Sequence, residues 1–186
     1  MDIISHGLWA GIGTKIANRK NKSLKLSFKL AFFWGMFPDL FAFTFPFLRM
    51  VWNYAIRGST FTDLRHHYGA QPPWWATDHY PILGIASYLY NLSHSLIIFG
   101  IVFITVALLN HMNLKRAPWE MIGWFLHIIS DIPTHTANFF TTPFLWPISS
   151  YRFVHGFSWA TDWFMILNYS LLLGFYVFFR PKKSRS

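Results

Sequence analysis

The stretch LHIISDIPTHT, residues 126–136, places three ionisable side chains at intervals of four residues: His127, Asp131 and His135. On a helix, residues i and i+4 lie on one face, so His127 and Asp131 can bind one metal ion together. Pro133 removes a backbone hydrogen bond and predicts a bend or an end of the helix at that point. His135 is therefore predicted to swing either toward the pair or away from it.

These ionisable residues stand in an apolar chain. Its 186 residues are 53% hydrophobic, 21% aromatic and only 12% charged, whereas ordinary soluble domains carry about 25% charged residues. Residues 82–110 contain no Asp, Glu, Lys or Arg, and about 20 apolar residues are enough to cross a bilayer. The composition predicts a single integral membrane domain, residues 1–186. The absence of cysteine excludes disulfides, thiolate metal sites and a cysteine nucleophile.

The apolar segments predict an all-α, polytopic membrane protein with about four transmembrane helices. The predicted spans are residues 24–48 (interrupted by Pro38 and Pro46), 82–110, 118–136 and 158–179. A short re-entrant or interfacial helix is expected over residues 3–17, where Gly7 and Gly11 share one face that suits close helix packing. The connecting loops are expected at residues 49–81 and 137–157.

Basic residues gather in three patches between the apolar segments, and the net charge is +9. Lysine and arginine mark cytoplasmic loops, and a four-span arrangement puts all three patches on one side of the membrane. Both termini are therefore expected in the cytoplasm. No nucleic-acid partner is expected, because aromatic residues do not alternate with the basic ones. The patches fall within residues 15–29, 115–116 and 180–185.

Ionisable residues of different predicted segments lie at similar depths. With a rise of 1.5 Å per residue, counting from the cytoplasmic ends puts Asp39, His94 and Asp131 at roughly 22, 24 and 20 Å. The same count puts His127 at roughly 14 Å, and His6 at roughly 17 Å if the first helix dips into the membrane. Ionisable groups inside a membrane are functional hypotheses by default. This set favours a metal with nitrogen and oxygen ligands, zinc first and manganese second.

Taken singly, two of these residues also have simpler interpretations. His94 lies between Ser93 and Ser95 and could be a hydrogen-bonded packing residue. Asp39 follows Pro38 and could cap a helix. The metal interpretation depends on the residues acting together.

Five short motifs occur in order along the chain: SHGLWAG (5–11), FPDL (37–40), LSHSL (92–96), HIISD (127–131) and PFLWPISSYRF (143–153). Together they resemble the LexA-regulated, membrane-bound metal-dependent hydrolase family, and more distantly the zinc-dependent phospholipase C and single-strand nuclease superfamily. The resemblance implies a protein of the bacterial inner membrane with metal ligands at His6, Asp39, His94, His127 and Asp131. Relatives often carry a second acid after Pro-Asp, where this chain has Leu40, so His79 or His135 is a candidate to replace a lost ligand.

Three classes of function fit these residues. The first is a metal-dependent hydrolase of a phosphoester or ester, acting on a membrane lipid or another membrane-associated substrate. Asp39 or Asp131 would serve as its general base where it is not a ligand. The second is a transport or proton-relay protein, since pumps also contain intramembrane His and Asp, although residues 97–109 carry no ionisable group toward the cytoplasmic face. The third is a non-catalytic scaffold with a structural metal.

Overall fold

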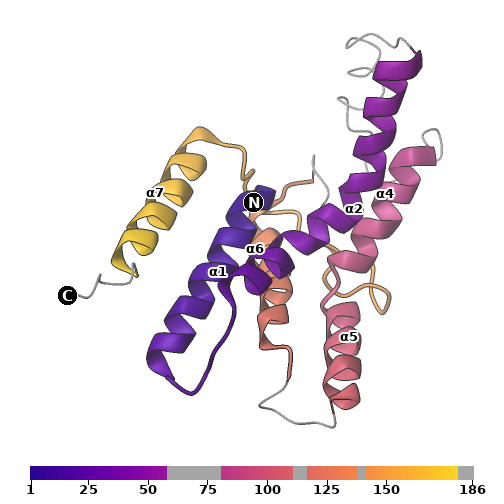
Figure 1. The fold of residues 1–186 in the computed structure, drawn as a ribbon. Helices are drawn as coiled ribbons and strands as arrows, with labels where there is room; N and C mark the ends of the chain where they lie inside the picture. The colour runs from indigo at the N-terminus through magenta and orange to yellow at the C-terminus, as the bar shows by residue number, and fades with distance from the viewer. Residues whose placement is uncertain (58–80, 111–116, 138–140, 180–186) are drawn as a thin grey trace.

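The computed structural model describes residues 1–57, 81–110, 117–137 and 141–179, and this part of the chain is helical (Figure 1). It contains no β-strand, only an isolated bridge between Thr136 and His155. The prediction of an all-α fold is confirmed. The elements are α1 (Ile3–Lys20), α2 (Phe28–Arg57), α4 (Pro81–Ser93), α5 (Leu96–Leu109), the 3₁₀ turn η3 (Trp119–Met121), α6 (Ile122–Thr134) and α7 (Asp162–Phe178).

Helix α1 lies at the centre of the molecule, in contact with α2, α6 and α7 (Figure 1). Its glycines permit the close approach to α2. A Cβ atom at Gly7 would lie 2.8 Å from the ring of Phe32, and one at Gly11 would lie 2.5 Å from the ring of Phe28. The prediction that these glycines form a packing face is confirmed, although α1 extends past the predicted end at residue 17, to Lys20.

Helix α2 continues through both of its prolines. The predicted interruption at Pro38 and Pro46, and the predicted start of a loop at residue 49, are wrong, because the helix runs to Arg57. A proline inside a helix removes one backbone hydrogen bond, but a helix can continue where its neighbours support it. Here α1, α4 and α6 all pack against α2, so tertiary contacts support the helix across its prolines.

The predicted span over residues 82–110 is broken in the middle, so a single continuous helix is wrong there. Helix α4 ends at Ser93, α5 begins at Leu96, and the two helices are bent by 56° relative to each other. Ser95 stabilises the new helix start, because its Oγ accepts hydrogen bonds from the first turn of α5 and donates one to the carbonyl of Trp146. The backbone N–H of Leu96 donates to the carbonyl of Phe144 at 3.0 Å.

The described residues between α6 and α7, 135–137 and 141–161, contain no helix, as expected for the loop predicted at residues 137–157. Arg152 attaches this segment to α4, since its guanidinium donates to the carbonyl of Thr141 at 2.5 Å and to Oδ1 of Asn91 at 2.8 Å. Burial lowers the pKa of the Arg152 guanidinium from its ordinary value. The loop is thus a packed part of the structure that closes over the break between α4 and α5.

Length and composition allow one or two membrane spans in the described part of the chain. The segment Phe28–Arg49 of α2 is long and apolar enough to cross a bilayer, and the bent pair α4 and α5 gives a second if it forms one span. Helices α6 and α7 have only 13 and 17 residues. The arrangement with four spans stays a prediction.

Candidate metal centre

Four buried side chains meet where α2, α6 and the break between α4 and α5 come together: Asp39, His94, His127 and Asp131. Each offers one nitrogen or oxygen atom, and these atoms all lie within 4.8 Å of one another. Asp39 follows Pro38 on α2, His94 lies in the break, and His127 and Asp131 are one turn apart on α6. The group could hold a metal ion, and all four residues were predicted as ligands from the sequence.

The separations between these atoms suit a single small cation. Nε2 of His94 lies 3.5 Å from an oxygen of Asp39 and 3.5 Å from one of Asp131. Nε2 of His127 lies 3.7 and 3.1 Å from the same two oxygens, and the two Nε2 atoms are 3.1 Å apart. Zinc binds nitrogen and oxygen ligands at about 2.0–2.2 Å, so the ligands of one tetrahedral ion lie about 3–4 Å from one another.

Contacts on the outer side of both imidazole rings leave Nε2 of each ring facing the centre. Nδ1 of His127 lies 2.6 Å from the carbonyl oxygen of Gly35, which can only accept, so this nitrogen donates and the neutral ring keeps its lone pair on Nε2. Nδ1 of His94 lies 2.9 Å from the hydroxyl of Ser93, which can donate or accept, and 3.2 Å from the carbonyl oxygen of Tyr90. The lone pair of His127 therefore converges with two carboxylates, and these groups repel one another unless a cation or protons lie between them.

One carboxylate oxygen of the centre lacks a hydrogen bond. Oδ2 of Asp131 is buried and has no hydrogen-bond partner among the described residues. Its other oxygen, Oδ1, lies 2.6 Å from the amino group of Met1 and 2.9 Å from Nε2 of His6. A buried polar atom without a partner is costly, and a metal bound to Oδ2 would remove that cost. The residues present therefore fit a divalent metal such as zinc.

Glycines allow the helices to approach closely around the centre. A Cβ atom at Gly35 on α2 would lie 2.6 Å from the carbonyl oxygen of His6 on α1. A Cβ atom at Gly123 on α6 would lie 2.6 Å from the carbonyl oxygen of Ala31 on α2. A side chain at either position would push apart two of the three helices that carry or orient the ligands.

Trp124 on α6 supports the break that carries His94. Its indole Nε1 donates to the carbonyl oxygen of Ser93 at 2.5 Å, which satisfies a backbone group at the end of α4.

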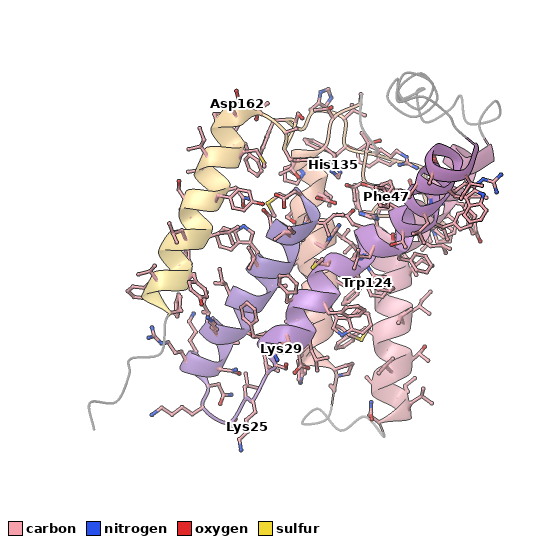
Figure 2. The ribbon with its side chains drawn as sticks, turned by 45° about the horizontal axis from the view of Figure 1, so that its top comes forward. Lys25, Lys29, Phe47, Trp124, His135 and Asp162 are labelled. Atoms are coloured by element: carbon pink, nitrogen blue, oxygen red, sulfur yellow. The ribbon has the colours of Figure 1, made fainter. Side chains whose placement is uncertain are left out.

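Figure 2 shows Trp124 and His135 among the helices, with Lys25 and Lys29 near one end of the molecule and Asp162 near the other.

His6 and His135 lie next to the four-residue group, not within it. The ring of His6 stacks on that of His127, with centroids 3.6 Å apart, and its Nδ1 lies 3.2 Å from Oγ of Ser130. Nδ1 of His135 lies 3.1 Å from the hydroxyl of Tyr90 and 3.9 Å from the nearest oxygen of Asp131. The remaining predicted candidate, His79, lies outside the described residues.

Sequence reasoning missed the residues that hold the ligands in place. Gly35, Ser95 and Trp124 are not ionisable, so a search for charged groups in apolar segments passes over them. One signal was present, because serine is a favoured helix N-cap and Ser95 directly follows His94. The carbonyl of Gly35 carried no signal, since its contact with His127 joins two helices far apart in the chain.

Comparison of the chain with family models, curated proteins and solved structures finds no match. The resemblance of its five motifs to the LexA-regulated hydrolases is therefore an expectation from the sequence. The arrangement of the chain's own residues is the basis for assigning a function.

Proposed function

We propose that this chain is a membrane-embedded, metal-dependent hydrolase of a phosphoester or an ester in a membrane-associated substrate. The convergence of His94 and His127 on the carboxylates of Asp39 and Asp131 is the observation that carries this proposal. These nitrogen and oxygen donors suit zinc first and manganese second. Bound there, the metal would lower the pKa of a water molecule and polarise the phosphoryl or carbonyl group under attack.

An opening at one ligand supports a catalytic role. Structural zinc sites are closed, whereas catalytic sites keep a position open for water or substrate. The side chains of His94, His127 and Asp131 are fully buried, whereas that of Asp39 retains 8% exposure. Asp39 also lines a cavity of about 580 Å³. Its carboxylate stands at the open edge of the centre and is our first candidate for the general base, which would leave His94, His127 and Asp131 as the three metal ligands. Asp131 is the alternative base, with Asp39 then a ligand.

Exposed apolar side chains support the membrane location. Ile166, Phe178 and Leu109 are 69, 70 and 75% exposed, and apolar surfaces of this kind mark contacts with lipid or with other proteins. Lys25 and Lys29 lie near the end of the molecule opposite Asp162 (Figure 2), as expected for a basic cytoplasmic side. In this proposal the chain is a member of the LexA-regulated hydrolase family in a bacterial inner membrane.

The proposal is tested by hydrolysis assays on the purified chain in detergent. The substrates are a fluorogenic phosphodiester, a fluorogenic carboxylic ester and mixed micelles of phospholipid. Chelation should abolish hydrolysis of at least one substrate, and added zinc or manganese should restore it. Asp39→Asn should lower the rate at least tenfold, because it removes the candidate base. Asp162→Asn is the matched control, because Asp162 lies at the start of α7, away from the centre.

Two results would count against a hydrolase. Hydrolysis that survives complete removal of metal would show that the centre is not the active site. A chain that binds metal in a one-to-one ratio but cleaves none of the three substrates would support a scaffold with a structural metal instead.

A further inference from the structure

The cavity beside Asp39 has an apolar body and a polar end. Its polar lining at the metal centre comes from Asp39, Tyr90 and His135, where the Tyr90 hydroxyl and Nδ1 of His135 are 3.1 Å apart. Met1 lines this end as well, and its amino group lies 2.6 Å from Oδ1 of Asp131. Asp2 also lines the cavity, but its carboxylate accepts hydrogen bonds from Ser5 and from α7. The apolar lining comes from α1, α2 and the loop before α7: Ile3, Ile4, Met36, Leu40, Phe43 and Trp159.

Among the cavities lined by described residues, this one meets exposed side-chain surface of a candidate ligand. Of the four candidate ligands only Asp39 retains exposed side-chain surface, and Asp39 lines this cavity. A second cavity, of about 450 Å³, lies between α1, α6 and α7 and touches His6 and His127. The side chain of His127 is fully buried, so the second cavity offers no exposed ligand atom.

We propose that the cavity of about 580 Å³ binds the hydrocarbon chain of an amphiphile and places the ester or phosphoester head group beside Asp39. This inference rests on the proposed function and adds the substrate class to it. The volume falls within the range of about 300–1,000 Å³ that is usual for small-molecule sites. A polar substrate would leave hydrogen-bonding groups unpaired against the apolar lining, which is costly, whereas a hydrocarbon chain would not.

One wall of the cavity belongs to α2, which carries Asp39, and the other to α1, which carries His6 beside the centre. Leu40 directly follows Asp39 on α2, and Ile4 lies half a turn before His6 on α1. A chain lying between these walls would hold its head group next to Asp39. Larger side chains at Leu40 or Ile4 should therefore reduce binding of the chain while the metal ligands stay in place.

Photolabelling tests this site without depending on hydrolysis. The probe is a long-chain alkylphosphonate, which carries a non-hydrolysable head group, with a diazirine at the end of the chain. It is irradiated with the zinc-loaded protein in detergent, and the labelled peptides are mapped by mass spectrometry. We expect labels within residues 1–4 and 36–43. Leu40→Trp should reduce labelling there at least fivefold, and Ile4→Trp should do the same from the opposite wall.

Leu171→Trp is the matched control, because it places the same side chain against the second cavity. It should leave labelling of the first cavity unchanged. Labels confined to the outer surfaces of α5 and α7, or equal labelling of Leu40→Trp, Ile4→Trp and the unchanged protein, would overturn the assignment of the cavity. Specific labelling of the cavity in a protein that hydrolyses nothing would support this site and reject the hydrolase, so the two failures are distinguishable.

Discussion

The carbonyl oxygen of Gly35 on α2 accepts a hydrogen bond of 2.6 Å from Nδ1 of His127 on α6. This bond turns Nε2 of His127 toward Asp39 and Asp131. The carbonyl can reach the ring only because α2 packs closely against its neighbours, and Gly35 lies at that contact. Helix packing and the orientation of a candidate ligand thus depend on the same residue.

Gly35→Ala should destabilise the protein and weaken its metal binding. The added Cβ would lie 2.6 Å from the backbone oxygen of His6, and overpacking of this kind costs about 1–3 kcal/mol. The melting temperature in detergent should fall by about 3 °C or more. Gly100→Ala on α5 is the control, because nothing lies within 4 Å of its Cβ position. Equal melting temperatures for the two variants would contradict the close packing at Gly35.

Ser95→Ala should destabilise the break that carries His94. The substitution removes the N-cap of α5 and the donor to the carbonyl of Trp146, which together are worth about 2 kcal/mol or more. Thermal melting and a zinc titration should both show the loss. Thr105→Ala is the control, since Thr105 is exposed and its hydroxyl donates to the carbonyl of Ile101 in the preceding turn of α5. A Ser95→Ala protein that melts like Thr105→Ala would show that the cap is not needed.

His6→Ala should weaken metal binding without abolishing it. His6 stacks on His127 and contacts Oδ1 of Asp131, but it lies outside the four-residue group. Loss of a residue that orients metal ligands typically lowers affinity about 10–100-fold. Titration against a competing chelator should therefore still give one metal per chain. If His6→Ala binds no metal at all, His6 is itself a ligand, as the sequence resemblance implied.

Titration of His135→Ala with metal against the same competing chelator compares the contribution of His135 to metal affinity with that of His6. His135 is 3.9 Å from Asp131 and bonds to Tyr90, so His135→Ala should lower the affinity by less than tenfold. A loss as large as that of His6→Ala would place His135 closer to the metal than the structure does.

Local spacing predicted the part of the centre that one helix carries. His127 and Asp131 are four residues apart, and α6 ends at Thr134, directly after Pro133, as the proline predicted. Counting depth along separate segments identified Asp39 and His94 as partners. These predictions succeeded because buried ionisable groups in an apolar chain must face one another.

The breaks and continuities of the helices could not be read from local sequence. Residues 82–110 contain no proline, yet the chain breaks around His94. At the break the backbone N–H of Leu96 donates to the carbonyl of Phe144, and the hydroxyl of Ser95 donates to that of Trp146. Helix α2 contains two prolines and still continues to Arg57. In both cases contacts between distant segments outweigh the local preference, and a single sequence does not reveal those contacts.

Metal analysis of the purified protein tests the central claim most directly. After exposure to zinc and dialysis, the unchanged chain should hold one zinc ion, whereas His127→Ala and Asp131→Asn should hold almost none. His155→Ala is the matched control, because His155 lies in the loop bridge to Thr136, and it should keep the full metal content. A folded wild-type protein that holds no metal, or a His127→Ala protein that holds as much as wild type, would contradict the account.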